Sequence, residues 1–485
     1  MPPTDPIQHV VLLMLENHSF DQMLGCLKAV NPDVNGVDLQ NPGKNTDSDG
    51  RVYFQKETDE VQTVYDPRHE LIDVQQQIAD SNGGFVANFS KTYPRSSFED
   101  RQQIMGYYGL GKLPALHALA QDFTVCDQWF SSLPGPTWPN RFFALSGTSN
   151  GEIQMPESTL QDLNPSFYFH QNQDTIFDRL NSAGRSWKVY YYDFPNSWLL
   201  LHQLEHPENL SRYHHIDKFF AEVSEPAGFP DFVFIEPKYF GQDQNDDHPP
   251  HNVIKAEKLV ADVYNALRSS PLWDSTLLIV TFDEHGGFYD HVVPPPAIPP
   301  DDKQSRYAFN QYGVRVPALL ISPWVGRRAE HTLFDHTSVL RYLSDKWGLA
   351  PLGQRTASAN SIAAGITEST ARTDTVPFIR VPYASLIAPS PELEKEDVSD
   401  HQEAIRGFSR LLERATDDPA YTHPYPAPGA WAKIKNSLGK KFIGLGNSLT
   451  ADYQTIQDSR VRRLTGLVKD LAKSGRKLNL PNQHT

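Results

Sequence analysis

The stretch HVVLLMLENHSFD, residues 9–21, decides the fold. Six apolar residues, 10–15, end directly on Glu16 and Asn17. An apolar run that does not alternate with polar residues is typical of a strand buried on both faces of a sheet. Side chains that follow such a strand lie at its carboxyl end, which is the edge where open parallel sheets bind ligands. The stretch therefore predicts a central strand that carries Glu16 and Asn17 to a binding site.

Other segments repeat this pattern and are separated by helical ones. Apolar residues recur at helical spacing in 174–184 and 254–267. Strands that alternate with helices predict an α/β fold, with a central, mostly parallel sheet sandwiched between helices. The further strands are expected at 187–192 (WKVYYY), 231–235 (DFVFI), 276–282 (TLLIVTF) and 314–321 (VRVPALLI).

Composition limits the class of protein. A chain of 485 residues is long enough for one large domain with an appendage, or for two domains. The net charge of −15 argues against nucleic acid as a partner, because phosphate backbones require a basic surface. Two cysteines, Cys26 and Cys126, provide no disulfide framework. Oligomeric state is not readable from the sequence.

The sequence shows no recognisable targeting or membrane segment. Residues 1–11, MPPTDPIQHVV, lack the positive region that opens a secretory signal peptide. No stretch reaches the roughly 18 apolar residues of a membrane span. We therefore expect a soluble protein, either cytoplasmic or exported by a non-classical route.

Asp283 and Glu284 follow the apolar run 276–282 just as Glu16 and Asn17 follow theirs. Carboxylates that meet at one sheet edge repel each other unless a cation lies between them. Oxygen ligands alone favour a hard or borderline divalent ion. In the alternative, Glu16 caps a helix and Asp283 opens a polar loop. The presence of two such strand ends favours the metal site.

GPTWPNR, residues 135–141, places Thr137 just before an expected helix with an early proline. A threonine there fits the N-cap position. Helix N-termini also bind phosphate, and a hydroxyl at such a site beside a metal could attack phosphorus. On this stretch alone the structural cap is the favoured interpretation.

Three of the 18 histidines have unusual neighbours: His69 in YDPRHE, His248 in NDDHPPHN and His291 in DEHGGFYDHVVPP. Positioned imidazoles could hold phosphoryl oxygens or protonate a leaving alkoxide. Gly286 and Gly287 allow the backbone to approach a ligand closely. Each histidine taken alone is more often structural.

Taken together, these stretches resemble the phosphoesterase family of non-specific phospholipases C and related acid phosphatases. The matching motifs are collinear from residue 9 to about residue 360. The family's usual ENRSFD reads ENHSFD, so that His18 stands where the family carries the permanently charged Arg. The motifs are ENHSFD (16–21), DPRHE (66–70), NGG (82–84), MGYY (105–108), LHALAQDFTVCDQWF (116–130), GPTWPNR (135–141), DDHPPHNV (246–253), TFDEHGGFYDHVVPP (281–295), RVPALLISPW (315–324) and FDHTSVLRYL (334–343).

The resemblance implies an alkaline phosphatase-like fold and a role for each matching residue. Thr137 would be the nucleophile and would also contact the metal. His69 and His248 would bind phosphate, and His291 would be an acid or would support another site residue. The cofactor would be one divalent ion, Zn, Ca, Mg or Mn. The implied metal ligands are Glu16, Asn17, Thr137, Asp283 and Glu284.

The implied activity is phospholipase C-type hydrolysis of phosphatidylcholine-like glycerophospholipids to diacylglycerol and a phosphorylated head group. One alternative is a broad acid phosphatase that acts on phosphomonoesters. The other is a catalytically silent relative that binds lipid or phosphate. The loops 151–172 and 194–216 could select the head group, because their aromatic side chains could line a choline pocket or simply pack. Those side chains are Phe167, Tyr168, Trp198 and Tyr213.

The C-terminal part differs in composition from the rest. We expect a catalytic domain over 1–370 and a proline-rich and helical region over 371–485, with a helical pattern at 400–415. Residues 430–480 hold eleven Lys and Arg against three Asp, a charge of +8, which leaves −23 for the remainder. The pattern at 456–477 is typical of a helix on a membrane surface. An ordinary helix docked on an acidic body has the same pattern, and this is the favoured alternative.

Overall fold

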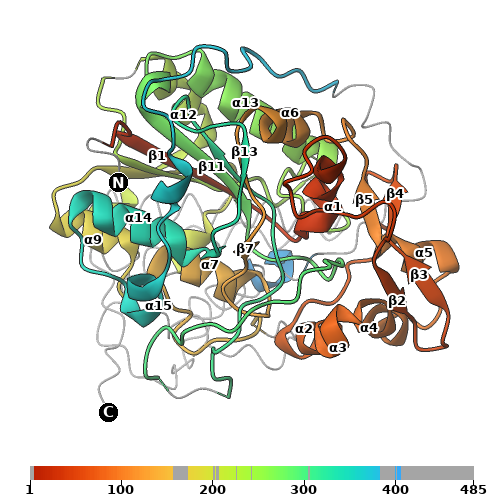
Figure 1. Ribbon diagram of the computed structural model, residues 1–485. Coiled ribbons are helices and arrows are strands. Elements are labelled where there is room, and N and C mark those ends of the chain that lie inside the picture. The colour runs from red at the N-terminus through yellow and green to blue at the C-terminus, as the bar shows by residue number, and fades with distance from the viewer. Residues whose placement is uncertain are drawn as a thin grey trace, which may run out of the picture.

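The structure, a computed structural model, centres on one sheet of eight strands in the order β13-β6-β12-β11-β1-β10-β8-β9 (Figure 1). It describes residues 5–156, 173–199, 203, 207–225, 227–241, 243–303, 306–382, 399 and 401–405. The strands of the sheet are β1 (His9–Leu15), β6 (Thr124–Cys126), β8 (Trp187–Tyr191), β9 (Tyr213–His215), β10 (Phe232–Ile235), β11 (Thr276–Phe282), β12 (Ala318–Ile321) and β13 (Arg328–Glu330).

Strand β1 lies between β11 and β10, and both neighbours run parallel to it. Leu13 pairs with Ile235 of β10, and Leu15 pairs with Phe282 of β11, so the three strands end at the same edge. All of β11 and all of β1 beyond His9 are buried, as expected for strands covered on both faces. Only β12 runs antiparallel to its neighbours, which confirms the predicted mostly parallel sheet.

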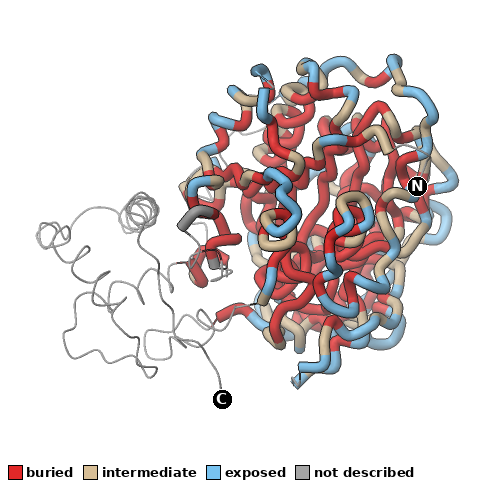
Figure 2. The backbone as a smooth tube through the Cα atoms, turned by 90° about the vertical axis from the view of Figure 1, so that its left-hand side faces the viewer, coloured by how far each residue is buried: buried red, intermediate tan, exposed pale blue. Residues whose placement is uncertain are grey.

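Helices cover both faces of the sheet (Figure 1). Figure 2 shows that the buried residues are concentrated in the centre of the molecule. The predicted helices at 254–267 and 174–184 are present as α13 and α9. A capping box between Thr175 and Asp178 begins α9. One face carries α6 (Pro114–Asp122), α12 (Ile216–Ser224) and α13 (Val253–Arg268); the other carries α7 (Thr137–Ser146), α9 (Ile176–Ser182), α14 (Thr337–Trp347) and α15 (Gly353–Ser358).

Residues 44–108 form a lobe beside the sheet, on the right in Figure 1, with a separate small core around Phe85 and Phe89. Helix α1 (Phe20–Leu24), which follows β1, packs against this lobe through β5. The lobe consists of β2 (Lys44–Thr46), β3 (Val52–Phe54), β4 (Lys56–Thr58), β5 (Gly106–Tyr108), α2 (Leu71–Gln77), α3 (Ala79–Asn82), α4 (Phe85–Thr92) and α5 (Phe98–Gln103). The remaining short elements are η1 (Gly25–Ala29), β7 (Trp129–Phe130), η2 (Asn196–Leu199), α11 (Pro207–Leu210), η3 (Trp273–Ser275), β14 (Phe334–Asp335) and η4 (Ile362–Gly365).

Little of the region after residue 370 belongs to the described chain. Residues 371–382 continue from the body, and residues 401–405 are helical, within the pattern predicted at 400–415. The basic segment, with its predicted helix at 456–477, lies outside the described residues, so the division at 370 stays a prediction. Within the described residues, no helix is long and apolar enough to cross a membrane.

Candidate active site

The ends of β1 and β11 bring four of the predicted metal ligands together. Glu16 and Asn17 follow β1, Asp283 and Glu284 follow β11, and all four are fully buried. The backbone N–H of Asn17 donates to Asp283 Oδ1 at 3.2 Å. The register of two adjacent parallel strands thus places three carboxylates and an amide at one edge, as the sequence predicts.

A glycine allows the two strand ends to come this close. Gly286 has φ of +61°, and a Cβ built on it would lie 2.0 Å from the carbonyl oxygen of Asn17. Asn17 itself has φ of +61°, a conformation that asparagine adopts more readily than most residues. The Gly286-Gly287 pair therefore serves contact between backbones.

Thr137 reaches this group from helix α7. Its hydroxyl donates to Asn17 Oδ1 at 3.3 Å, and the residue is fully buried. The prediction that Thr137 is the N-cap is wrong by one position, because Pro136 is the N-cap and makes no side-chain cap bond. Pro136 keeps the chain extended (ψ −179°), so Thr137 begins the first turn and its hydroxyl is directed to the strand ends.

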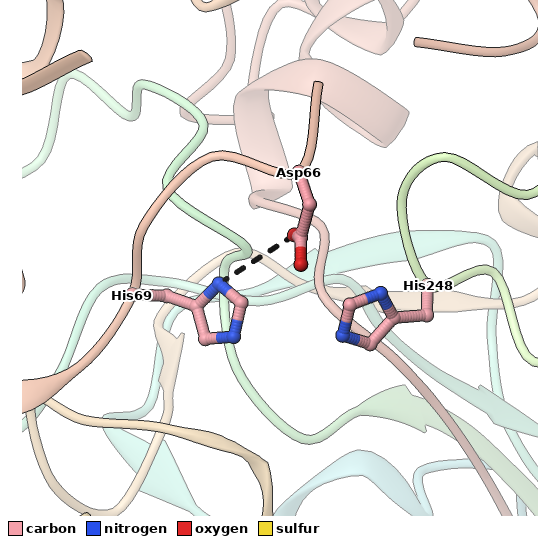
Figure 3. Close-up of side chains that lie close together, drawn as sticks. All are labelled: Asp66, His69 and His248. Atoms are coloured by element: carbon pink, nitrogen blue, oxygen red, sulfur yellow. Dashed lines mark ion pairs between the residues drawn. The ribbon is translucent and has the colours of Figure 1, made fainter. Parts of the chain in front are cut away.

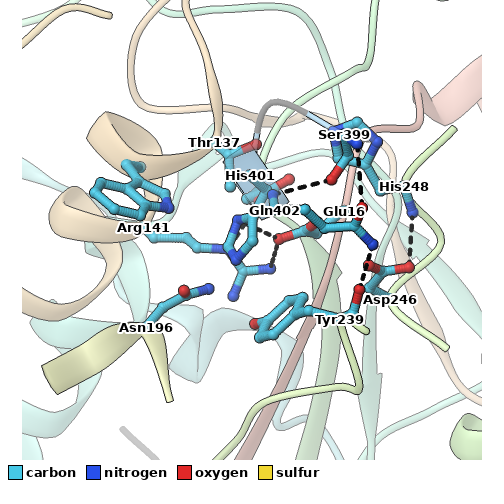
Figure 4. Close-up of polar contacts among 12 residues, drawn as sticks. Glu16, Thr137, Arg141, Asn196, Tyr239, Asp246, His248, Ser399, His401 and Gln402 are labelled. Atoms are coloured by element: carbon cyan, nitrogen blue, oxygen red, sulfur yellow. Dashed lines mark hydrogen bonds and ion pairs between the residues drawn. The ribbon is translucent and has the colours of Figure 1, made fainter. Parts of the chain in front are cut away.

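Arg141 lies one turn after Thr137 on the same face of α7 and contacts both strand ends. Its Nε donates to Asp283 Oδ2 at 2.9 Å, and its Nη2 lies 3.0 Å from Glu16 Oε1 (Figure 4). The side chain is 3% exposed. Arg141 was not among the site residues predicted from the sequence, although its spacing of four residues from Thr137 in GPTWPNR is a usable signal.

The electrostatics of the group favour a bound cation. Burial raises the pKa of Glu16 well above its usual range and that of Asp283 to about 6, although Arg141 opposes the rise at both. At Glu284, the neighbouring imidazoles of His69 and His285 outweigh burial, and its pKa is lowered. Glu16 Oε2 and Glu284 Oε1 are buried without a hydrogen-bond partner. Three carboxylates against one guanidinium, with such oxygens, fit a divalent ion.

His69 and His248 face each other beside this group (Figure 3), with ring centroids 5.8 Å apart. The Nδ1 of His69 donates to the carbonyl of Pro67 at 2.7 Å, and that of His248 donates to the carbonyl of Pro249 at 2.6 Å. Because each Nδ1 is directed to a proline carbonyl, each Nε2 lies on the opposite side of its ring. The Nε2 of His69 lies 3.4 Å from Asn17 Nδ2, which links the histidines to the strand ends.

These histidines can serve either of two ligands. With Asp66 they form a group whose possible ligand atoms lie within 4.8 Å of one another. Neutral imidazoles fixed through Nδ1 present lone pairs to a cation, whereas imidazoliums donate to phosphoryl oxygens. A bound cation and a bound phosphoryl group would each support phosphate ester chemistry at the adjacent strand ends.

The structure does not bring His291 into this group. Its Nδ1 lies 2.8 Å from Asp21 Oδ2, and its Nε2 lies 3.0 Å from Asn35 Oδ1. Arg315, fully buried, bonds Asp21 and Asp290 in the same cluster, so the two carboxylates already have a cation. These contacts favour a structural role for His291 over that of a catalytic acid.

Two further buried histidines support the strand ends. His336 Nε2 donates to the carbonyl of Asp283 at 2.6 Å, and burial lowers the pKa of His336 to about 4. His18 has its pKa lowered to about 4 by burial and stacks on Phe288 with centroids 5.1 Å apart. His18, which replaces the family's Arg, is held by two hydrogen-bond contacts, from Nδ1 to Gln22 Oε1 at 2.7 Å and from Nε2 to the carbonyl of Asp247 at 2.9 Å. His336 lies within the motif FDHTSVLRYL but was not among the predicted site residues.

A narrow cavity lies beside Arg141 and has room for about one water molecule. Arg141 Nη1 and both amide atoms of Asn196 are buried there without a hydrogen-bond partner. Trp198 and Tyr213, predicted as choline-pocket candidates, pack against each other in the core at 5.8 Å, and Phe167 and Tyr168 lie outside the described residues. The cavity is lined by Trp138, Arg141, Phe142, Leu145, Asn196, Ser197 and Phe234.

Comparison with known proteins places this geometry in a family. Non-specific phospholipase C3 of Arabidopsis thaliana is 34% identical over 436 residues, covering 82% of this chain and 80% of the relative. Non-specific phospholipase C6 of the same plant is 36% identical over 358 residues, covering 69% and 66%. Phospholipase C B of Mycobacterium tuberculosis is 29% identical over 426 residues, covering 75% and 77%.

Among solved structures, phosphonate monoester hydrolase of Agrobacterium radiobacter aligns with a TM-score of 0.34 at 11% identity, covering 76% of this chain and 79% of that one. A score this low establishes no common fold, so the fold assignment rests on strand order and burial. The model of the phosphoesterase family matches residues 7–350, well over half of the chain. The chain therefore belongs to the phosphoesterase family and is a hydrolase of phosphoric ester bonds.

Proposed function

We propose that this protein is a phospholipase C that cleaves phosphatidylcholine-like glycerophospholipids to diacylglycerol and a phosphorylated head group. The observation that carries the proposal is the contact of the Thr137 hydroxyl with Asn17 at the edge where three carboxylates meet. The relatives named phospholipase C, in a plant and in a bacterium, support the choice of lipid substrate.

The metal ligands in this proposal are Glu16, Asn17, Asp283 and Glu284, with Thr137 at the same ion. When bound, a divalent ion lowers the pKa of a neighbouring hydroxyl and offsets the negative charge that builds on phosphoryl oxygens. Zn, Ca, Mg and Mn all accept the oxygen ligands present. Arg141 offsets part of the carboxylate charge and holds Glu16 and Asp283 in place through its two contacts.

The remaining residues perform in-line phosphoryl transfer. The Thr137 hydroxyl gives its proton to water and its oxygen bonds to phosphorus, while the bond from phosphorus to the glycerol oxygen breaks and diacylglycerol leaves with a proton taken from water. Water then hydrolyses the bond from phosphorus to the Thr137 oxygen, which releases the phosphorylated head group and restores the hydroxyl. His69 and His248 hold the phosphoryl oxygens, whose charge is greatest in the transition state.

An acid phosphatase is the second candidate, because the same residues would cleave a phosphomonoester. The complete burial of Thr137 favours it, since a small ester reaches a buried hydroxyl more readily than a lipid does. A silent binding relative is disfavoured, because Thr137 contacts Asn17 at the strand ends that carry the four side chains proposed as ligands.

A head-to-head assay separates the two. We expect kcat/KM for phosphatidylcholine in mixed micelles to exceed that for p-nitrophenyl phosphate by at least about tenfold, which is about 1.4 kcal/mol of transition-state binding. The Thr137→Val protein, prepared in parallel, measures contaminating activity on each substrate. A preference for p-nitrophenyl phosphate would establish the phosphatase instead.

A further inference from the structure

Part of the C-terminal region returns to the strand ends that hold the proposed metal site. The family match ends at residue 350, yet the Nδ1 atom of His401 lies 3.1 Å from Glu16 Oε1 (Figure 4). Both side chains are fully buried. His401 follows Glu16 by 385 positions, so only the tertiary fold brings the two together.

The position of His401 is fixed by aromatic neighbours. Its ring stacks on Tyr239 with centroids 4.4 Å apart and an interplanar angle of 26°. It meets Trp138 edge to face at 6.2 Å and 82°. Trp138 is the neighbour of Thr137 in α7, and Tyr239 follows β10, so His401 is held between two elements that frame the site.

The next residue anchors the same segment. Gln402 Nε2 donates to the carbonyl oxygen of Tyr239 at 2.5 Å, and Gln402 N donates to the hydroxyl of Ser399 at 3.1 Å. Tyr239 thus accepts a hydrogen bond from Gln402 and stacks against the ring of His401. Two adjacent contacts on one residue restrict both the position and the rotation of the imidazole.

His401 and Arg141 both contact the same oxygen of Glu16, at 3.1 and 3.0 Å. Arg141 also bonds Asp283, so it ties Glu16 to the other strand end. His401 adds a contact from outside the sheet. Residues that hold a ligating carboxylate typically change metal affinity or activity by 10–100-fold when they are lost.

We propose that His401 is a positioning residue for Glu16, and that the segment around it completes the metal site. The inference rests on the proposed function only in taking Glu16 as a metal ligand. The C-terminal region would then be part of the catalytic unit, beyond any role at a membrane. The imidazole acts through Glu16 and does not contact the substrate.

The test is metal affinity of the full-length protein, measured by titrating the metal-free form with Zn²⁺ and with Mn²⁺ in a calorimeter. His401→Phe keeps the ring between Tyr239 and Trp138 and removes both nitrogens. We expect the Kd for the metal to rise at least about tenfold with an unchanged circular dichroism spectrum. His401→Asn, whose amide N–H₂ stands near the place of Nδ1, should recover most of the affinity.

Asp283→Ala, which removes a proposed ligand, is the control that shows the calorimetric signal of a protein that does not bind metal at this site. Unchanged affinity in His401→Phe would overturn the inference and leave His401 as packing. Unchanged affinity with faster turnover would also overturn it, because the segment would then be an inhibitory cover.

If His401→Phe does not fold, a second variant is used. Gln402→Ala loosens the segment while keeping the imidazole, and unchanged metal affinity in Gln402→Ala would contradict the inference equally. Weaker metal binding in His401→Phe, together with no hydrolysis of phosphatidylcholine by the wild-type protein, would support the inference and contradict the proposed substrate alone.

Discussion

Single residues at the strand ends carry charges that the protein alone does not balance. Glu16 and Asp283 have their pKa raised by burial, and Glu16 Oε2 has no hydrogen-bond partner. Only Arg141 offers them a fixed positive charge among the described contacts. A bound divalent ion would favour the ionised carboxylates and supply the missing ligand.

The first prediction concerns Asp283. Asp283→Ala should bind no metal at the site and lose hydrolysis of phosphatidylcholine, while its circular dichroism spectrum stays that of the wild type. Metal content after dialysis, measured by mass spectrometry, and turnover check this. Asp345→Ala is the matched control, because Asp345 is a partly exposed carboxylate that pairs with Arg341 away from the site. Wild-type turnover in Asp283→Ala would remove Asp283 from the ligands.

The second prediction concerns pH and His117, which lies away from the proposed metal. Burial lowers the pKa of His117 from 6.5 to about 4, and its Nε2 donates to the carbonyl of Met23 at 2.8 Å. The unfolded chain takes up this proton first as pH falls, so stability is lost between pH 6.5 and about 4. His117 alone accounts for about 3 kcal/mol.

Unfolding by urea at a series of pH values measures this loss. His117→Gln cannot titrate, so its free energy of unfolding should fall less steeply over the same pH window, whatever its absolute stability. The slope is the readout, because the substitution also changes packing. Equal slopes in the two proteins would show that His117 titrates normally in the fold.

Among the elements, the strands were the most predictable. Runs of buried apolar residues indicated β1, β8, β10 and β11, and the carboxyl residues after β1 and β11 indicated the site. Non-alternating burial does not reveal strand direction, so the antiparallel pairing of β12 was not readable. β12 begins only at Ala318, directly after Pro317, because proline has no N–H to donate to a ladder.

The sequence left other parts of the site hidden. The lobe at 44–108 has three-residue strands, too short to show a periodic pattern. His336 and His401 reach the site only through contacts between distant parts of the chain. The N-cap position was missed by one residue because a threonine followed by an early proline fits both Ncap and N1.

The loop after β11 gives a prediction at this scale. Gly286→Ala should separate the strand ends, because its Cβ would meet the carbonyl oxygen of Asn17. We expect metal binding and turnover to fall at least about tenfold. Gly184→Ala is the control, since Gly184 has a similar φ of +65° but nothing within 4 Å. Equal effects of the two substitutions would mean that backbone conformation alone matters and that the contact does not.

Across the whole molecule, charge is divided unevenly along the chain. The segment 430–480 carries +8 and the remainder −23, and the segment lies outside the described residues. A basic helical pattern is attracted to anionic lipid by about 1 kcal/mol per Lys or Arg near the surface. Peripheral contact with a membrane through this region stays a prediction.

Deletion of residues 430–485 tests that contact while keeping His401 and Gln402. The shortened protein should bind vesicles containing phosphatidylserine more weakly in a sedimentation assay, and it should hydrolyse p-nitrophenyl phosphate at the rate of the full chain. Vesicles of phosphatidylcholine alone are the uncharged control. An insoluble product would mean that the segment covers the body of the protein, and the membrane proposal would lose its support.

The central claim is that Thr137 is the nucleophile, and it is tested most directly by locating the phosphoryl group. A slowly hydrolysed phosphatidylcholine analogue, acid quenching and peptide mass spectrometry should find the phosphorylated head group on the peptide that contains Thr137. Thr137→Ser, which keeps the oxygen, should also be labelled. Thr137→Val, which keeps the shape and loses the oxygen, should be unlabelled and should lose several orders of magnitude in turnover. Normal turnover of Thr137→Val, or the phosphoryl group on another residue, would contradict the account and make Thr137 a structural residue of α7.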